Sequence, residues 1–330
     1  MSTPRIVVLD GFTLNPGDLS WAPLAALGRL MVFERSTPRE LLSRAAGAEL
    51  LITNKAVIDR AAIEALPELR YIGVTATGTN IVDRDAARSR GVVVSNVPSY
   101  GADSVAEHAL SLMLEGVKHL SQHLGAVRAG GWSKQPDFSF TVAPVSLLAG
   151  KTLGLVGLGA IGGRVAELGL AFRMTVLAAR REGERAADAS SSTSGATPPG
   201  VERVPLDELL GRADILSLHC PLTKENERFV DARRLAQMKP TALLINTSRG
   251  GLIDEAALAA ALERRQIAGA YLDVLSLEPP PEGHPLLGLP HCWITPHMAW
   301  ASVEARRRLL DVSIANVCAF LAGHPVNVVT

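Results

Sequence analysis

Three side chains that can bind charge or move a proton follow short apolar runs in the second half of the chain. Arg249 lies in NTSRGGLID, Glu278 in LDVLSLEPPP and His297 in ITPHMAW. A guanidinium fork matches a planar carboxylate, and an imidazole can give or take a proton near neutral pH. A lone residue of these types at a strand end is more often structural than catalytic. Three of them, each just beyond a different strand of one sheet, favour a catalytic site.

A glycine-rich turn, VGLGAIGGR, has the spacing of a dinucleotide-binding motif. Gly157 would permit the tight turn, Gly159 the close approach of a pyrophosphate, and Gly162 the packing of helix against strand. The N–H groups of the helix start, with Ala160 and Ile161 in its first turn, would face the phosphates. The alternative is an ordinary glycine-rich turn, but the strand pattern before it and the helix pattern after it favour a cofactor site.

The position that separates the two nicotinamide dinucleotides carries arginines. About 20 residues after the first glycine, NAD-binding proteins place an acid that accepts from the ribose 2′-hydroxyl. Here the strand pattern MTVLAA is followed by Arg180 and Arg181. Two guanidiniums would bind a 2′-phosphate, which a carboxylate would repel. We therefore predict that NADP(H) is the preferred cofactor and NAD(H) the second choice; the alternative is that both arginines are solvated loop charges.

Two series of strands and helices would position these groups. The first 98 residues hold Val- and Ile-rich runs at 5–10, 30–34, 49–53, 71–76 and 91–97. A second series begins at 151–159 and continues at 214–219, 242–248, 268–273 and 292–296. Continuous apolar runs alternating with amphipathic segments are typical of parallel sheets covered on both faces. The sequence therefore predicts an α/β fold.

A long helical pattern separates the two series. Residues 101–130 have helical periodicity, with Ser104 as a candidate cap, and they predict one helix of roughly 40 Å that bridges two domains. The chain has 330 residues, more than one core usually supports. We predict two Rossmann-like or flavodoxin-like domains with a cleft between them. The dinucleotide-binding domain would span 99–298, and the substrate domain 1–98 completed by 299–330.

Composition argues against several other classes of protein. The 33 Lys and Arg balance 33 Asp and Glu, which is unlike a nucleic-acid-binding surface. The three cysteines are scattered, so neither a disulfide framework nor a metal site is predicted. No apolar run reaches the roughly 18 residues of a membrane span, and the start lacks a signal core. We expect a cytoplasmic protein, and we expect it to bind neither nucleic acid nor membrane.

Several motifs in combination resemble the D-isomer specific 2-hydroxyacid dehydrogenases. GLGAIG, NTSRGGLIDE, DVLSLEP and TPHMAW occur in the family's order, and ATGTNIVD and NVPSYGADSVAEHAL also match, so the resemblance covers essentially the whole chain. The variants VTATGTN and PHMAW resemble the branch that reduces hydroxypyruvate and glyoxylate. The family usually has Asp at the position of Arg180, and this departure puts the use of NAD in doubt.

The resemblance implies a role for each candidate residue. Arg249 would hold the substrate carboxylate and keto oxygen, His297 would protonate that oxygen during reduction, and Glu278 would orient His297. Substrate would also be bound by Thr77, Gly78, Tyr100 and Trp300. Asp273 would accept a hydrogen bond from the nicotinamide carboxamide, and the cofactor cleft would further be lined by His219, Pro221, Thr223 and Thr247.

The sequence thus predicts reversible, NADPH-dependent reduction of a small 2-keto acid to the D-2-hydroxy acid, with hydroxypyruvate or glyoxylate favoured. The resemblance also suggests a homodimer formed through the helix at 101–130. One alternative is an NAD-dependent dehydrogenase of the D-lactate or phosphoglycerate type. Another is a dinucleotide-sensing, corepressor-like binding protein, which we would expect to carry partner-binding extensions outside the fold.

Overall fold

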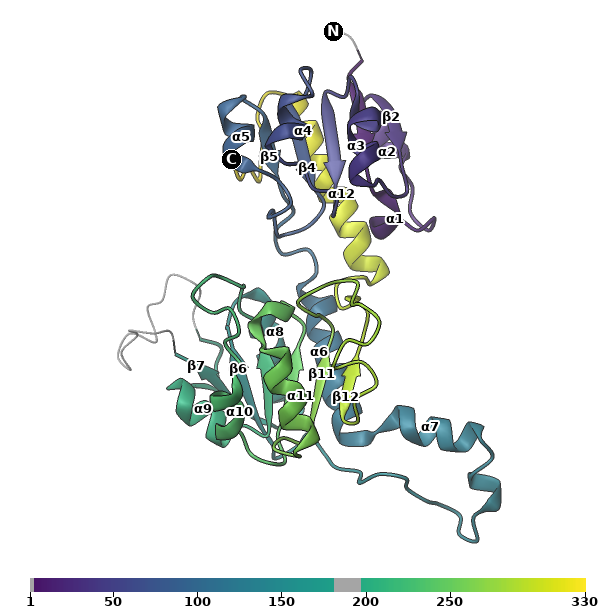
Figure 1. The fold of residues 1–330 in the computed structure, drawn as a ribbon, viewed down its shortest axis with the longest axis vertical. Coiled ribbons are helices and arrows are strands. Elements are labelled where there is room, and N and C mark those ends of the chain that lie inside the picture. The colour runs from purple at the N-terminus through teal and green to yellow at the C-terminus, as the bar shows by residue number, and fades with distance from the viewer. Residues whose placement is uncertain (1–2, 181–196) are drawn as a thin grey trace. The chain divides into compact units, whose positions relative to one another are not determined.

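The computed structural model describes residues 3–180 and 197–330, which form two compact units (Figure 1). Unit 1 comprises Met1–Gly101 and Ala301–Thr330, and unit 2 comprises Ala102–Trp300. Each unit is a parallel sheet with helices on both faces. The predicted α/β class with two parallel-sheet domains is confirmed.

Unit 1 is built on a five-stranded parallel sheet in the order β2-β1-β3-β4-β5, a flavodoxin-like order. Its strands are β1 (Arg5–Val8), β2 (Arg29–Val32), β3 (Leu50–Thr53), β4 (Tyr71–Val74) and β5 (Val93–Ser95). Successive residues of a strand face opposite sides, so continuous apolar runs require cover on both. One face is covered by α3 (Pro38–Ala45), α4 (Arg60–Glu64) and α5 (Arg84–Ser89). The other face is covered by α2 (Ala22–Ala25) and α12 (Val303–Leu321), and the short α1 (Gly11–Leu14) follows β1.

Polar capping residues set where the helices of unit 1 begin. At α3, Thr37 and Glu40 form a capping box, with Pro38 in the first turn. The Asp59 and Asp83 side chains accept from backbone N–H groups in the first turns of α4 and α5. These local signals explain why short helices with few buried residues still start at defined positions.

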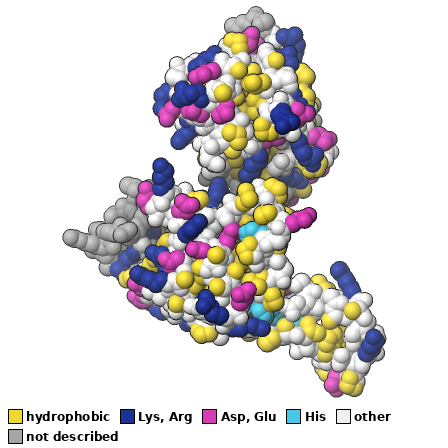
Figure 2. Space-filling model, in the orientation of Figure 1, with side chains coloured by type: hydrophobic (Ala, Val, Ile, Leu, Met, Phe, Trp, Pro, Cys, Tyr) yellow, Lys and Arg dark blue, Asp and Glu magenta, His cyan; other side chains and the backbone are white. Residues whose placement is uncertain are grey.

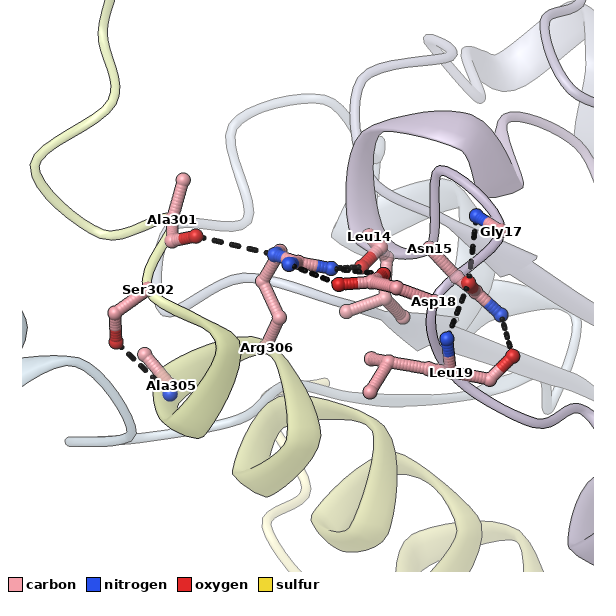
Figure 3. A network of polar contacts seen from close by, with 9 residues as sticks. All are labelled: Leu14, Asn15, Gly17, Asp18, Leu19, Ala301, Ser302, Ala305 and Arg306. Atoms are coloured by element: carbon pink, nitrogen blue, oxygen red, sulfur yellow. Dashed lines mark hydrogen bonds and ion pairs between the residues drawn. The ribbon is translucent and has the colours of Figure 1, made fainter.

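A buried arginine ties α12 to the loop that follows α1 (Figure 3). Arg306 Nη1 and Nη2 donate to the Asp18 carboxylate at 2.7 and 2.6 Å, and Nη1 also donates to the Leu14 carbonyl at 3.2 Å. Arg306 Nε donates to the Ala301 carbonyl at 3.1 Å. These hydrogen bonds hold the pKa of Asp18 below its usual value and raise the pKa of Arg306. The Asp18 carboxylate therefore balances the positive charge of Arg306, whose side chain is 9% exposed.

We expect Asp18→Asn to lower the Tm at neutral pH, because the Arg306 guanidinium would remain buried without its counter-charge. The pKa of Asp18 is lowered on folding, so its stabilising effect is present above the unperturbed value of 3.8 and is lost as the pH falls through the folded pKa. The Tm difference between wild type and variant should therefore shrink below about pH 4. Thermal unfolding over a pH series measures this.

Glu34→Gln is the matched control, because Glu34 pairs with Arg35 on the surface with both side chains well exposed. That variant should leave the Tm nearly unchanged. A Tm deficit in Asp18→Asn that is the same at every pH would contradict the assigned role of the charge.

Unit 2 is built on a seven-stranded parallel sheet in the order β12-β11-β10-β9-β6-β7-β8. Its strands are β6 (Thr152–Val156), β7 (Thr175–Ala179), β8 (Val201–Val204), β9 (Ile215–Leu218), β10 (Leu243–Asn246), β11 (Gly269–Leu272) and β12 (Cys292–Ile294). The strand order reverses between β6 and β9, and ligands of such sheets bind outside the carboxyl ends of the strands near that point. One face is covered by α6 (Ala102–Lys118) and α8 (Ala160–Ala171). The other is covered by α9 (Leu206–Arg212), α10 (Ala232–Gln237) and α11 (Glu255–Glu263).

The prediction of one continuous helix across 101–130 is wrong. The helix α6 ends at Lys118 because His119 adopts the left-handed φ of 50°, and a separate helix, α7 (Leu120–Arg128), follows. The Glu115 carboxylate, in the last turn of α6, accepts from the Ser121 N–H at 3.2 Å and so caps the start of α7. Every residue of α7 is at least partly exposed. Figure 1 shows α7 on an extension of unit 2, residues 119–145, which we call the arm.

The predicted strands are all present, with ends that differ by a few residues. The edge strand β8 was not predicted, because Glu202 and Arg203 interrupt its apolar pattern. Val201 and Val204 lie on opposite faces of this strand, each beside a charged residue, so its four residues carry little of the hydrophobic signal.

Candidate active site

The candidate residues of unit 2 lie in loops at one edge of its sheet. All seven strands are parallel, so their carboxyl ends share that edge. The neighbouring strands β10, β11 and β12 are followed by the loops of Arg249, Glu278 and His297. The strands β6 and β7 are followed by the glycine turn and by Arg180. The predicted catalytic residues thus occupy one half of the edge, together with the predicted cofactor residues Thr247 and Asp273, and the glycine turn and Arg180 occupy the other half.

His297 and Glu278 form a hydrogen-bonded pair between the loops after β12 and β11. His297 Nδ1 lies 2.5 Å from Glu278 Oε2, while Oε1 of the same carboxylate accepts from the Leu275 N–H at 3.0 Å. An ionised carboxylate accepts only, so Nδ1 carries the proton of this bond. The His297 side chain is 29% exposed, and its Nε2 has no hydrogen-bond partner within residues 3–180 and 197–330. The imidazole is therefore oriented by Glu278 and can present a proton at Nε2 to a bound molecule.

Arg249 is exposed at the start of a 3-10 turn that follows β10. Its Nη1 donates to the Ser248 carbonyl at 2.7 Å, and its own carbonyl accepts from Asn246 Nδ2 at 2.9 Å. The next residue, Gly250, lies against the loop after β11: a Cβ added there would be 1.9 Å from the Leu275 carbonyl carbon. The close approach requires glycine and locks the loop of Arg249 to the loop of Glu278.

The glycine turn has the backbone that a pyrophosphate requires. Gly157 has a φ of 100°, and a Cβ there would be 2.7 Å from the His219 carbonyl group. A Cβ on Gly162 would be 2.1 Å from the Gly157 carbonyl oxygen, so both positions need glycine. Gly159 caps α8 and faces open space, with no described atom within 4 Å of a Cβ added there, and Ala160 and Ile161 form the first turn. The free N–H groups of that turn fit a phosphate group of a dinucleotide.

Three other predicted cofactor residues at this edge, His219, Pro221 and Thr223, lie in segments held by hydrogen bonds within the protein. His219 Nε2 lies 2.8 Å from the Ser217 hydroxyl, and burial lowers the pKa of His219 to about 4, so the ring is neutral at pH 7. Asn226 closes the turn of Pro221 and Thr223, donating to the Pro221 carbonyl and accepting from the Thr223 N–H.

Thr247, directly after β10, has a buried hydroxyl with no partner among the described residues. A buried hydroxyl without a partner is costly, and a polar group of a bound cofactor would satisfy it. Together with the cradle of the glycine turn, this orphaned group shows that the residues present fit a dinucleotide.

Arg180 is the first residue after β7. Its N–H donates to the Val204 carbonyl at 2.9 Å, and its Nε donates to the Arg203 carbonyl at 3.2 Å. Those two bonds hold the base of the side chain at the end of the strand, where the acid of an NAD-binding protein would stand. Arg181 and the serine-rich segment that follows it lie outside the described residues.

Asp273, at the end of β11, has a different environment from the one its predicted nicotinamide contact suggests. It is 1% exposed, and both carboxylate oxygens accept hydrogen bonds from the segment around His297. Burial would raise its pKa, but hydrogen bonds from His108, Thr295 and the Ala299 N–H outweigh that effect and lower it. The contact of Asp273 with the nicotinamide carboxamide stays a prediction. In the structure, its carboxylate holds the segment around His297 in place.

The predicted substrate residues Thr77, Gly78 and Tyr100 belong to unit 1, whereas Trp300 is the last residue of unit 2. Thr77 follows β4; its hydroxyl donates to the Val97 carbonyl at 3.0 Å, and its carbonyl accepts from Asn96 at 2.7 Å. The loop of Thr77 and Gly78 is therefore fixed to the segment after β5 at the carboxyl edge of that sheet.

Two residues of α6 contact this site and were missed. Ser104, proposed from sequence as a helix cap, lies inside α6 and donates to the Ala299 carbonyl at 2.6 Å. His108 Nε2 lies 3.0 Å from the Thr295 hydroxyl. Their four-residue spacing, which puts both side chains on one face of the helix, was the available signal.

Within the part of the chain that the structure describes, no cluster of His, Cys, Asp or Glu could hold a metal ion. The helices of residues 3–180 and 197–330 include none that is both long and apolar enough to cross a bilayer.

Comparisons with known proteins give consistent matches. A family model described as D-isomer specific 2-hydroxyacid dehydrogenase, NAD binding domain, matches residues 110–299. A hydroxypyruvate reductase of Blautia hydrogenotrophica is 41% identical over 98% of this chain and 99% of its own. A glycerate dehydrogenase of Methylorubrum extorquens is 39% identical over 89% of each chain. The solved structure of an NADPH-dependent glyoxylate/hydroxypyruvate reductase from Sinorhizobium meliloti, in complex with NADP and malonate, has a TM-score of 0.79 and 29% identity, covering 100% of this chain and 97% of that chain.

Proposed function

Because the chain belongs to the D-isomer specific 2-hydroxyacid dehydrogenase family, we propose that it reduces a small 2-keto acid to the D-2-hydroxy acid with NADPH. Membership makes it an NAD(P)-dependent oxidoreductase, as the motifs predicted. The observation that carries the proposal is the His297–Glu278 pair, oriented with Nε2 unpartnered among the described residues, at the sheet edge that also holds the glycine turn. Hydroxypyruvate and glyoxylate are the favoured substrates, supported by the names of the relatives.

In this proposal each residue has one task during reduction. Bound reduced nicotinamide would supply the hydride to the carbonyl carbon. Arg249 binds the substrate carboxylate and stabilises the charge that develops on the keto oxygen. His297, protonated on both nitrogens, gives the Nε2 proton to that oxygen and keeps Nδ1–H on Glu278. The negative charge of Glu278 stabilises the imidazolium before the transfer, and the reverse reaction runs the same proton back to Nε2.

We propose that the substrate contacts four further residues, Thr77, Gly78, Tyr100 and Trp300. Backbone N–H groups around Thr77 and Gly78 would meet the carboxylate, and the Trp300 indole would limit the group on carbon 2. The alternative for Trp300 is a purely structural packing role. The support for these four residues is the match of ATGTN, NVPSYGADSVAEHAL and PHMAW to the family.

A substrate-by-cofactor matrix of specificity constants tests the proposed function. Hydroxypyruvate and glyoxylate should rank above bulky, branched or aromatic 2-keto acids, and NADPH above NADH. A preference for phenylpyruvate would contradict the substrate assignment. Preference for NAD(H) with D-lactate or phosphoglycerate as the hydroxy acid would favour the first alternative, and binding of dinucleotide with no turnover of any 2-keto acid would favour the corepressor-like alternative.

Arg180→Asp should reverse the cofactor preference, because it removes a cation that can bind the 2′-phosphate and offers an acceptor to the ribose hydroxyl. One charge-assisted hydrogen bond contributes roughly 1.5–3 kcal/mol, which predicts about a tenfold to hundredfold preference for NADPH in the wild type. Arg181→Ala should weaken NADPH alone. The measurement is kcat/KM for NADPH and NADH in each variant.

Arg212→Gln is the control for Arg180, because Arg212 is a partly exposed arginine of unit 2 paired with Glu202 and Glu208. It should leave both constants unchanged. Equal use of the two cofactors by the wild type, unaltered in Arg180→Asp, would show that the arginines are ordinary solvated charges.

We propose a homodimer formed through α6 and the arm. Large apolar side chains of the arm are exposed (Figure 2). Leu120, Leu124 and Val127 have the spacing of one face of α7, and Trp132 and Phe138 follow the helix. Exposed apolar surface of this kind is typical of an interface. Light scattering should give about twice the chain mass of 34.9 kDa, and a monomer at all concentrations would overturn the assignment.

A further inference from the structure

The segment that carries His297 has a backbone that needs external support. His297 itself has a φ of 53°, a left-handed conformation that is unfavourable for a residue with a Cβ. Its N–H donates to the Thr295 and Asp273 carbonyls, each at 2.9 Å. A conformation of this kind persists only where surrounding contacts over-determine it. The contacts that do so therefore fix where the imidazole points.

The Asp273 carboxylate is the first of these contacts. Oδ1 accepts from the Met298 N–H at 2.9 Å and Oδ2 from the Ala299 N–H at 2.8 Å, so one side chain holds the two residues after His297. Oδ1 also accepts from the Thr295 hydroxyl at 2.6 Å, which holds the segment before His297. Hydrogen bonds to a buried, ionised acceptor are among the stronger ones in proteins.

The helix α6 supplies the second set of contacts. Ser104 and His108 are one helical turn apart, so their side chains lie on the same face. The Ser104 hydroxyl donates to the Ala299 carbonyl at 2.6 Å. His108 Nε2 lies 3.0 Å from Thr295 Oγ1 and 3.5 Å from Asp273 Oδ1, and its side chain is 16% exposed.

The directions of these hydrogen bonds follow from the atoms available. The single hydroxyl proton of Thr295 goes to Asp273, because the carboxylate at 2.6 Å can only accept. Thr295 Oγ1 must then accept from His108, so Nε2 of His108 carries a proton. Donation therefore runs from His108 through Thr295 to Asp273, and the same carboxylate accepts from the backbone N–H groups of Met298 and Ala299 beside His297.

We propose that Ser104 and His108 are positioning residues for His297, acting through Thr295 and Asp273 to fix the segment 295–299. Both stand on α6, which packs against β10 and β11, so they fix the loop of His297 relative to the core of the sheet. Without them the imidazole loses the alignment of Nδ1 with Glu278 and of Nε2 with the substrate. The inference rests on the proposed proton-donor role of His297.

The test compares His108→Leu, which removes the donor, with His108→Gln, which keeps an N–H donor on a side chain of similar reach. A misplacement of about 1 Å can cost roughly 100-fold in rate, so a partial loosening should lower kcat about tenfold in His108→Leu. KM for hydroxypyruvate and Kd for NADPH should stay within about twofold, because the binding groups are untouched. His108→Gln should recover most of the lost kcat.

Ser104→Ala should also lower kcat without raising KM, and it removes a single oxygen, so it carries the test if His108→Leu does not fold. Ser111→Ala is its matched control, since the Ser111 hydroxyl lies on the same helix, is exposed, and donates to the Glu107 carbonyl. The control should retain wild-type kcat. Unchanged kcat in both Ser104→Ala and folded His108→Leu, or a His108→Gln as impaired as His108→Leu, would overturn the proposal.

A second readout does not depend on turnover. The short Nδ1–H bond between His297 and Glu278 should give a low-field proton resonance in the wild type, identified by its loss in His297→Ala. That resonance should shift or broaden in His108→Leu and persist in His108→Gln. If the wild type reduces no 2-keto acid, the proposed function fails while this readout still decides the positioning role; an unperturbed resonance in His108→Leu would overturn that role alone.

Discussion

His297→Ala should lower kcat by about 10²–10⁴-fold, the usual contribution of a positioned general acid. The Nδ1 bond to Glu278 and the unpartnered Nε2 make this the one imidazole of the described candidate site arranged to deliver a proton to a substrate. NADPH affinity should change little, because the residues of the glycine turn are untouched. Steady-state reduction of hydroxypyruvate, together with a fluorescence titration of NADPH, measures both quantities.

Glu278→Gln should have the milder effect, since the amide can still orient the ring but no longer stabilises its positive charge. His324→Ala provides the control, because His324 is an exposed histidine beyond the end of α12 and should keep full activity. Near-normal turnover in a folded His297→Ala protein would show that the proton comes from another group.

Arg249→Ala should lower kcat/KM by about 10²–10⁴-fold, with both a higher KM and a lower kcat. The guanidinium can make two charge-assisted hydrogen bonds to a carboxylate and keto oxygen, each contributing roughly 1.5–3 kcal/mol. These hydrogen bonds are present in the enzyme–substrate complex and strengthen as charge develops on the keto oxygen. Their loss should therefore raise KM and lower kcat. Arg249→Lys should recover only part of the loss, because an ammonium lacks the planar fork.

Added guanidinium ion should partly restore Arg249→Ala and leave Arg264→Ala unaffected. Arg264 serves as the control because it is an exposed arginine at the end of α11, with its Nε on the Ala260 carbonyl. A folded Arg249→Ala protein with unchanged KM and kcat would remove the carboxylate-binding assignment.

The parts of the fold that could be predicted are those whose signal is local. Runs such as RIVV and LLIN are apolar at nearly every position, which a strand buried on both faces requires. The glycine turn was predictable for a similar reason: Gly157 and Gly162 sit where a Cβ would strike backbone atoms. The loop residues Arg249, Glu278 and His297 could be placed at one edge because parallel strands share their carboxyl ends.

The parts that could not be predicted depend on contacts between distant segments. The break at His119 leaves the helical periodicity almost intact and is defined by one left-handed residue and by the Glu115 cap. The pairing of Arg306 with Asp18 joins opposite ends of the chain and has no local signature. The contact of His108 with Thr295 likewise follows only from how α6 packs on the sheet, so its spacing alone could not identify a partner.

The close approach at Gly250 has a consequence for engineering this protein. Since a Cβ there would overlap the Leu275 carbonyl group, the loop after β10 and the loop after β11 are shaped to each other. Replacing only one of these loops with that of a relative that has another substrate would bring two unmatched backbones together. At Gly250 the two loops have no side chain between them that could adjust to the difference. Residues 246–254 and 273–278 should therefore be exchanged together. Recombination libraries made to change the substrate preference should place their crossover points before residue 246 or after residue 278, and not between the two segments.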